Sequence, residues 1–507
     1  MNPVPAPPVG PSPRPDALVA ELDAAAQTRG GSRLSESPGM TPERSISADA
    51  RVSRALHALG RETPFPLRTS PPRSLADRMR ACATPGVSIG IVERGEVVWE
   101  GGFGTRLAGA SQEVAADTLF QAGSISKPVF AVAVMRLAAR GALDLDEDVN
   151  AYLTSWRIPS NDGWSPRVTL RQLLSHSAGT SVHGFPGYPA TGPWPTLTEV
   201  LEGASRANTV PIVVEGLPGA VFRYSGGGTT IAQQVVADVS QRPFAALMRE
   251  LVLDPAGMRH SSFEQPLPPA AAARAASGHP WNGEPVPGGW HVYPEMAAAG
   301  LWTTAGDLAR LGAELMRILR GGASALGLER ETVAAMLRPQ LMHQAIGGKF
   351  MGIGWFCDGE GASFHFSHGG QNHGFLAHMQ MYPERDAGAA VMINAIQGWP
   401  LTGEILAALG REFGWADRPN PAPGFAASAA KDCVGTYRRP GGAAVHIASA
   451  EDGLTLQFGG QQPVPLIPHT PVIFVASVID LRVAFDRAAG LTLHQFGTEL
   501  RFDRDDR

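Results

Sequence analysis

Ser124 and Lys127 lie three positions apart in the segment "QAGSISKPVF", and this pair could carry nucleophilic chemistry. The chain contains 39 arginines but only three lysines, Lys127, Lys349 and Lys431. Arginine stays charged in a protein, whereas burial or a neighbouring cation can shift a lysine amine toward its neutral form, which accepts a proton. A lysine kept beside a serine in such a chain indicates a base for the serine hydroxyl. A solvated surface lysine early in a helix is the plainer alternative.

The residues after Lys127 predict the helix that would position this pair. The run "PVFAVAVMRLAARG" is apolar on all sides as far as Arg136 and ends at Gly141, a residue type common just past a helix. Pro128 fits only the first turn, so we expect the helix to begin near Ser124. Backbone N–H groups at that end would stabilise an oxyanion, and Lys127 would lie one turn further on the same face.

Two further stretches carry side chains suited to a cleft. In "FRYSGGGTT", Tyr224 precedes a glycine run and could project its hydroxyl into a cleft, although a core tyrosine with a satisfied hydroxyl explains this stretch alone. In "HFSHGGQNHGFLAHMQMYP", Gly369 and Gly370 remove side chains from a predicted strand, so a ligand or another backbone can approach. His368 would lie at the edge of that gap.

Two competing motifs are not favoured. Four histidines are close in sequence, namely His365, His368, His373 and His378. No carboxylate or thiol in the same run completes a metal-ligand set with them, and strand alternation would divide them between two faces, so we expect neither a metal nor another cofactor. "GVSIG" matches the G-x-S-x-G pattern, but Ser88 lies in an alternating stretch that continues into a hairpin at 86–104, where that motif needs a strand followed by a helix.

Composition excludes several classes of partner. The 507 residues carry a net charge of −5, which gives no indication of nucleic acid binding or of an anionic membrane surface. No signal peptide or membrane span is apparent, so the expectation is a cytoplasmic protein acting on a small-molecule ester or amide. The three cysteines have no metal-type spacing and are expected to pack as small apolar residues. The oligomeric state stays open.

Changes in composition divide the chain into four parts. Residues 1–72 are rich in proline and arginine and are expected to be largely disordered, with a short helix around "DALVAELDAAAQ". Residues 73–415 mix helical and β stretches and would form the hydrolase domain. Residues 416–429 are expected to be a linker. Residues 430–507 contain short alternating segments separated by turns, which is typical of a small antiparallel barrel or sandwich.

Together these motifs resemble those of the serine β-lactamase and penicillin-binding protein superfamily, in particular its class C-like branch with carboxylesterases and D-stereospecific peptidases. Ser-x-x-Lys at 124–127, Tyr-Ser-Gly at 224–226 and His-Gly-Gly at 368–370 occur in the order of that family. "LRQLLSHSAGT", "LDPAGMRHSSF", "AAAGLWTTAGDLARLG" and "GIGW" also resemble recurrent segments of the branch. The resemblance implies an α+β β-lactamase-like fold, with an antiparallel sheet flanked by helices, a helical subdomain and an appended C-terminal lipocalin-like barrel.

The resemblance also implies roles for individual residues. Ser124 would be the nucleophile, Lys127 its partner in proton transfer, and Tyr224 the second proton carrier. His368 stands where many relatives have the lysine of Lys-Thr-Gly. The oxyanion hole would combine the backbone N–H of Ser124 with that of Gln371, which follows Gly369 and Gly370.

One position departs from the pattern of the branch. Gly226 replaces the usual asparagine, which in the family helps to hold a substrate amide, and this favours an ester. The expected function is a serine hydrolase that forms an acyl-enzyme on small carboxylic esters. The alternatives are a β-lactamase or D-stereospecific peptidase of the same fold, and a non-catalytic penicillin-binding-like sensor.

Overall fold

The computed structural model describes most of the chain. The described residues are 47–59, 73–161, 163–342 and 349–415 and, in the C-terminal part, 432–439, 442, 444–450, 453–459, 463–470, 472–476, 481–486, 490–495 and 498–505. Within these ranges, no helix combines the length and apolar character needed to cross a bilayer.

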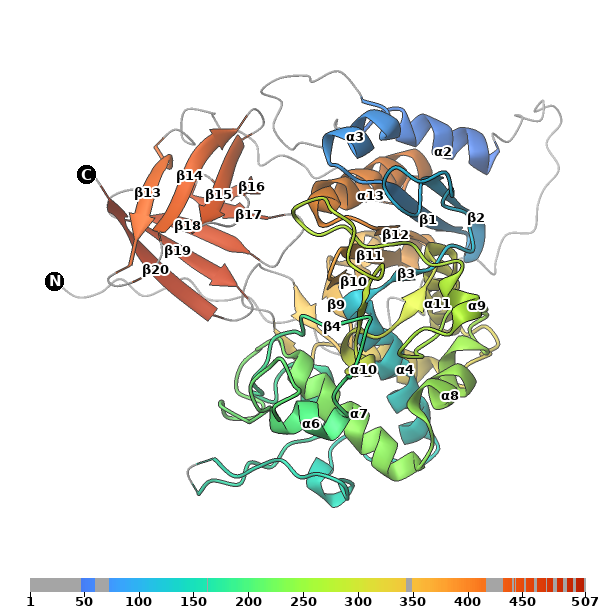
Figure 1. The fold of residues 1–507 in the computed structure, drawn as a ribbon, viewed down its shortest axis with the longest axis vertical. Coiled ribbons are helices and arrows are strands. Elements are labelled where there is room, and N and C mark those ends of the chain that lie inside the picture. The colour runs from blue at the N-terminus through green and yellow to red at the C-terminus, as the bar shows by residue number, and fades with distance from the viewer. Residues whose placement is uncertain are drawn as a thin grey trace, which may run out of the picture.

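An antiparallel sheet forms the centre of the main domain (Figure 1). Its strands in spatial order are β2 (Glu96–Gly104), β1 (Gly86–Glu93), β12 (Ala387–Ile393), β11 (Phe375–Tyr382), β10 (His365–Asn372), β9 (Phe356–Asp358), β8 (Phe350–Met351) and β7 (Leu341–Met342). β1 and β2 form the predicted hairpin, and Ser88 pairs with Gly102 inside it. β9 pairs with β10 only from His365 to Ser367, so it leaves the glycine-bearing part of β10 uncovered.

Helices cover both faces of this sheet (Figure 1). α13 (Trp399–Phe413) packs on β11 and β12, and α2 (Ala48–Leu56) packs on α13, whereas α11 (Ala305–Leu319) packs against β1, β2 and β12. Strand alternation separates the two sides. Val87, Ile89 and Ile91 of β1 belong to the apolar core shared with α2 and α13. Gly90 abuts α11, where a Cβ would lie 2.3 Å from the Ala305 carbonyl oxygen.

A helical region lies beside the sheet and surrounds one central helix. It includes α4 (Ser126–Ala139), α5 (Leu170–Leu174), α6 (Leu197–Glu202), α7 (Gly226–Ser240) and α8 (Phe244–Met248). Every residue of α4 from Ser126 to Arg136 is buried. Such a helix needs neighbours on all sides, and α10 (Met296–Ala299) and the turn at Arg249–Leu253 are among them. The apolar run after Lys127 therefore forms the buried helix that the sequence predicts.

The N-terminal region is more ordered than its composition predicts. Residues 48–56 form α2, and the hydroxyl oxygen of Ser47 caps the helix by accepting a hydrogen bond from Ala50 N. Val52 and Leu56 are buried in the core with α13, and Arg51 pairs with Glu93 at 2.7 Å. The expectation of disorder is thus wrong for this segment, because the proline-rich flanks conceal one short amphipathic helix. The helix expected around "DALVAELDAAAQ" lies outside the described residues.

The C-terminal part forms the β barrel that the sequence predicts (Figure 1). Its strands are β13 (Gly435–Arg438), β14 (Ala444–Ala450), β15 (Gly453–Phe458), β16 (Val464–Thr470), β17 (Ile473–Val475), β18 (Arg482–Asp486), β19 (Gly490–Gln495) and β20 (Thr498–Asp505). Neighbouring strands pair antiparallel in chain order, and β20 returns to β13 and closes the barrel. The α+β prediction with a C-terminal all-β barrel is confirmed.

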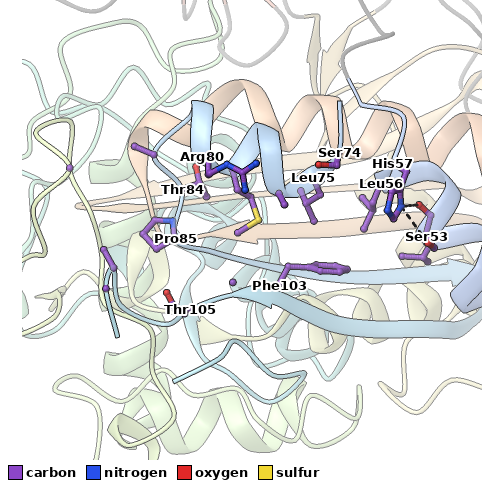
Figure 2. Close-up of a pocket in the computed structure, with 18 of the residues that line it drawn as sticks. Ser53, Leu56, His57, Ser74, Leu75, Arg80, Thr84, Pro85, Phe103 and Thr105 are labelled. Atoms are coloured by element: carbon purple, nitrogen blue, oxygen red, sulfur yellow. Dashed lines mark hydrogen bonds between the residues drawn. The ribbon is translucent and has the colours of Figure 1, made fainter. Parts of the chain in front are cut away.

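A cavity of about 880 Å³ lies between α2, α3 (Leu75–Ala81) and β2 (Figure 2). Apolar side chains such as Leu56, Leu75 and Phe103 line much of it, together with polar groups such as His57 and Arg80. None of the residues expected to be catalytic lines this cavity. It is therefore separate from the candidate active site.

Candidate active site

Ser124 lies in a single helical turn directly before α4. The turn spans Gly123–Ile125, and α4 continues from Ser126. Gly123 has φ +53°, and a Cβ there would lie 2.5 Å from the backbone nitrogen of Gln371. Glycine at this position therefore permits both the left-handed backbone and the close approach of the Ser124 turn to β10.

Lys127 holds the nucleophile from the buried side. Its Nζ donates hydrogen bonds to Ser124 Oγ and to the carbonyl oxygen of Ala298 in α10, each at 2.9 Å. The side chain is only 3% exposed, and burial lowers the Lys127 pKa to about 7. An amine with this pKa is partly neutral near pH 7, so it can accept the Ser124 proton. The surface-lysine alternative is excluded by this burial.

Tyr224 approaches Ser124 from the loop before α7. Burial raises the pKa of its hydroxyl far above the usual value, while a hydrogen bond with the Ser124 side chain acts in the opposite direction. The ring is held by His176, whose centroid lies 4.2 Å away, and stacks with Phe356 at 6.2 Å. Lys127 Nζ lies 5.0 Å from the centroid of the Tyr224 ring. The hydroxyl therefore stays protonated at neutral pH and can donate.

A cap at the start of α7 fixes this tyrosine. The Ser225 hydroxyl accepts a hydrogen bond from Gly228 N at 2.9 Å and donates to the Ser181 carbonyl at 2.7 Å. Ser225 N donates to His176 Nδ1 at 3.2 Å. A capping serine thus stabilises the helix start and anchors the residue before it. His176 therefore supports the turn that carries Tyr224.

His368 approaches from β10 as a neutral imidazole. Burial, followed by the charge of Lys127, lowers its pKa to about 3. Its Nδ1 donates to the Gly369 carbonyl at 2.6 Å, which leaves Nε2 as an acceptor. Within the described part of the chain, this buried Nε2 has no hydrogen-bond partner. Where many relatives place a cation, this chain therefore presents an acceptor.

Gly370, but not Gly369, allows β10 to lie directly against the Ser124 turn. A Cβ on Gly370 would lie 1.9 Å from the Ala122 carbonyl and 3.1 Å from Ser124 N, so no side chain fits there. A Cβ on Gly369 would meet nothing closer than the Ala377 carbonyl at 4.0 Å. Gly370 therefore permits β10 to pack closely on the Ser124 turn, which places the Gln371 backbone beside Gly123.

A cavity of about 330 Å³ opens over these groups. It is lined by Ser124, Tyr224, His368, Gly369, Gly370 and Gln371, all expected from the sequence. Lys127 does not line it and acts from beneath Ser124. His183 and Phe356 also line the cavity and were missed. Phe356 directly follows "GIGW", a segment noted only for its resemblance, whereas nothing local in the loop around His183 indicated a role.

Strand alternation places His365 and His368 on opposite faces of β10, yet His365, His368 and His378 all line this cavity. His365 and His368 have opposite parity in β10, and only His368 approaches the Tyr224 ring, at 6.3 Å between centroids. Across the described ranges, no cluster of three or more histidine, cysteine, aspartate or glutamate side chains is arranged to hold a metal ion. None of the three cysteines, all within the described ranges, forms a disulfide, and Cys357 and Cys433 are buried.

The Beta-lactamase family model matches residues 73–407, and the chain belongs to this family. Among curated relatives, esterase EstB of Burkholderia gladioli is 32% identical over 208 residues, which cover 39% of this chain and 52% of that protein. Unguisins hydrolase ungD of Aspergillus violaceofuscus is 25% identical over 260 residues, covering 47% and 43%. The chain thus spans about half the length of these relatives.

Solved structures share the fold. The octameric penicillin-binding protein homologue from Pyrococcus abyssi aligns with a TM-score of 0.58 at 20% identity, covering 85% of this chain and 98% of that one. The D-alanine carboxypeptidase AmpC from Burkholderia cenocepacia aligns with a TM-score of 0.52 at 21% identity, covering 67% and 96%. At these identities the similarity is one of fold.

Proposed function

We propose that this protein is a serine hydrolase that cleaves small carboxylic esters through a covalent acyl-enzyme. The observation that carries the proposal is the 2.9 Å hydrogen bond between Ser124 Oγ and Lys127 Nζ, whose pKa burial lowers to about 7. A base with a pKa near the working pH is well matched to general-base catalysis. Family membership and the named esterase and hydrolase among the relatives support a hydrolase.

In the proposed acylation, Lys127 takes the proton of Ser124 as Oγ attacks the ester carbonyl carbon. The carbonyl oxygen becomes an oxyanion that accepts hydrogen bonds from the backbone N–H groups of Ser124 and Gln371. The C–O bond to the leaving group then breaks. Tyr224 donates its proton to the departing alkoxide. The Lys127 ammonium then returns a proton to the Tyr224 oxygen, so both groups regain their starting protonation states.

Deacylation reverses these roles with water as the nucleophile. A water molecule attacks the acyl carbonyl, gives up its proton to the Lys127 and Tyr224 pair, and the Ser124 oxygen leaves as a hydroxyl. His368 Nε2 faces the same buried region as an acceptor, which suits a donor group on substrate or water better than a carboxylate. This feature and the missing side chain at Gly226 favour an uncharged ester over a β-lactam or a peptide with a free carboxylate.

The test is turnover of a chromogenic short-chain ester by the full chain, compared with Ser124→Ala. We expect turnover by the wild type that Ser124→Ala abolishes while it keeps its melting temperature. Turnover of a chromogenic cephalosporin and of a D-alanyl peptide, assayed on the same preparation, compares the ester activity with the β-lactamase and peptidase alternatives. Equal ester turnover by wild type and Ser124→Ala would overturn the proposal. Covalent labelling without turnover of any substrate would instead indicate the penicillin-binding-like sensor.

A further inference from the structure

His183 presents an imidazole to the mouth of the candidate active site. It lines the same cavity as Ser124 and Tyr224 and is partly exposed to solvent, while its contacts with the site shield part of the ring. The centroid of its ring lies 4.9 Å from that of Tyr224, with an angle of 45° between the ring planes. Burial and then the charge of Lys127 lower the His183 pKa. The ring also donates a hydrogen bond to the Tyr224 backbone. The imidazole is therefore neutral at pH 7, with one nitrogen engaged by that backbone and the other able to accept a hydrogen bond.

The backbone before His183 is held in an unfavourable conformation. Val182 has φ +58°, in the left-handed region that β-branched residues rarely adopt. Hydrogen bonds hold this segment on both sides: Gly227 N donates to the Val182 carbonyl at 3.0 Å, and Gly226 N donates to the His183 carbonyl at 2.9 Å. Such strain persists where surrounding contacts enforce it, and it clusters at binding and catalytic sites. The contacts thus fix the position from which His183 extends.

Gly226 explains why this loop can lie so close to Tyr224. A Cβ at position 226 would lie 3.0 Å from the Phe185 ring and 3.1 Å from the His183 carbonyl oxygen. A larger side chain at 226 would therefore displace the loop. His183 is thus a polar side chain of the cavity lining, and Gly226 leaves the room that its loop occupies.

We propose that His183 is a specificity-determining residue that hydrogen-bonds a polar substituent of the bound ester close to its scissile carbonyl. The inference deepens the proposed hydrolase function and rests on it. A site with a hydrogen-bonding group favours substrates that carry the matching partner, because a substrate that lacks it displaces water from the group without replacing the hydrogen bond. The expected substrate class is therefore esters with an amide or hydroxyl group near the carbonyl, in preference to plain alkyl esters.

The first experiment compares kcat/KM for two pairs of chromogenic esters. One pair differs on the acyl side, 4-nitrophenyl N-acetylglycinate against 4-nitrophenyl butyrate. The other differs on the leaving-group side, umbelliferyl acetate with and without a hydroxymethyl substituent. His183→Phe keeps a ring against Tyr224 but removes both nitrogens, and His183→Gln returns a donor and an acceptor. His57→Phe, at an exposed position in α2's C-cap, is the matched control.

We expect His183→Phe to lower kcat/KM for the polar member of one pair by about tenfold, the worth of one hydrogen bond of roughly 1.4 kcal/mol, with little effect on its alkyl partner. His183→Gln should recover part of the loss, and His57→Phe should not differ from wild type. The pair affected identifies the side of the substrate that His183 contacts. Unchanged ratios in both pairs, or equal losses for polar and alkyl esters, would overturn the proposal.

A binding measurement separates this inference from the hydrolase proposal. Ser124→Ala is titrated by calorimetry with N-acetylglycine methyl ester and with methyl butyrate, with and without His183→Phe. Tighter binding of the polar ester that His183→Phe removes supports the inference, even if the wild type turns over no ester and the hydrolase proposal fails. Equal affinities in both backgrounds overturn it, even if ester turnover is confirmed.

Discussion

Replacing Lys127 by arginine distinguishes a base from a fixed charge. Lys127 donates to both Ser124 Oγ and the Ala298 carbonyl at 2.9 Å, and an arginine could donate to the same two acceptors. Arginine cannot lose its proton in a protein, so it supplies charge and hydrogen bonds but no base. Lys127→Met removes the amine at similar length and completes the comparison.

The expected magnitude follows from the Lys127 pKa. With a pKa of about 7, about half of the amines are neutral at pH 7, about a tenth at pH 6 and about nine tenths at pH 8. The neutral form is the base, so acylation should speed up as pH rises through 7 and level off above 8. General-base assistance is typically worth about 10²–10⁴ in rate, and both variants should lose activity in that range.

The assay is the rate of Ser124 labelling by a fluorophosphonate probe between pH 5.5 and 9. Wild type should show the inflection near pH 7, and Lys127→Arg should show a low rate without it. Melting curves verify that the three proteins are folded. If Lys127→Arg labels at the wild-type rate while Lys127→Met does not, Lys127 acts as a charge, and the assignment as a base is refuted.

Three further predictions follow from individual contacts. Tyr224→Phe should lower ester turnover by about 10²–10⁴ because the proton donor is lost, with little change in melting temperature because the ring contacts remain; unchanged turnover would contradict this. Gly370→Ala should cost about 1–3 kcal/mol of stability and most activity, because its Cβ would lie 1.9 Å from the Ala122 carbonyl. Gly369→Ala, which has room for a Cβ, should be tolerated. Equal melting temperatures of the two variants would show that the contact with Ala122 is unimportant. Burial raises the pKa of Glu295 from 4.5 to about 8, so between these values the folded state retains a proton that the unfolded state has released, and the free energy of unfolding should decrease as pH rises. The melting temperature of the wild type should therefore fall relative to that of Glu295→Gln as pH rises in that window. If the two melting temperatures change with pH in parallel, the raised pKa of Glu295 is refuted.

Local patterns in the sequence predicted much of the fold. The hairpin at 86–104 and the barrel strands follow from alternation that each segment carries by itself, and α4 follows from Pro128 and the apolar run after it. The positions of Ser124 and Lys127 on one face of a helix start follow from helix geometry alone. Their meeting with Tyr224 and His368 required the family resemblance, because spacing along the chain says nothing about contacts between distant segments.

Long-range contacts account for what the sequence did not reveal. α2 is a nine-residue helix within a proline-rich region, and its stability depends on burial against α13, which no local window contains. His183 becomes part of the site because Gly226 and Ser225 draw its loop toward Tyr224. Nothing in "SVHGFPGYPATGPWP" indicates that contact.

The pairing of β1 with β12 determines when the main domain can complete its fold during synthesis. Val87 pairs with Ile393, so the sheet joins the beginning and the end of the hydrolase domain. Contacts so distant along the chain form late, after the entropy of closing a long loop has been overcome. Ser124 leaves the ribosome long before His368 and β12, so its turn has no β10 backbone to pack against until the end of the domain has been made. Until nearly the whole domain has been translated, the nascent chain cannot assemble the cavity that Ser124 and His368 share.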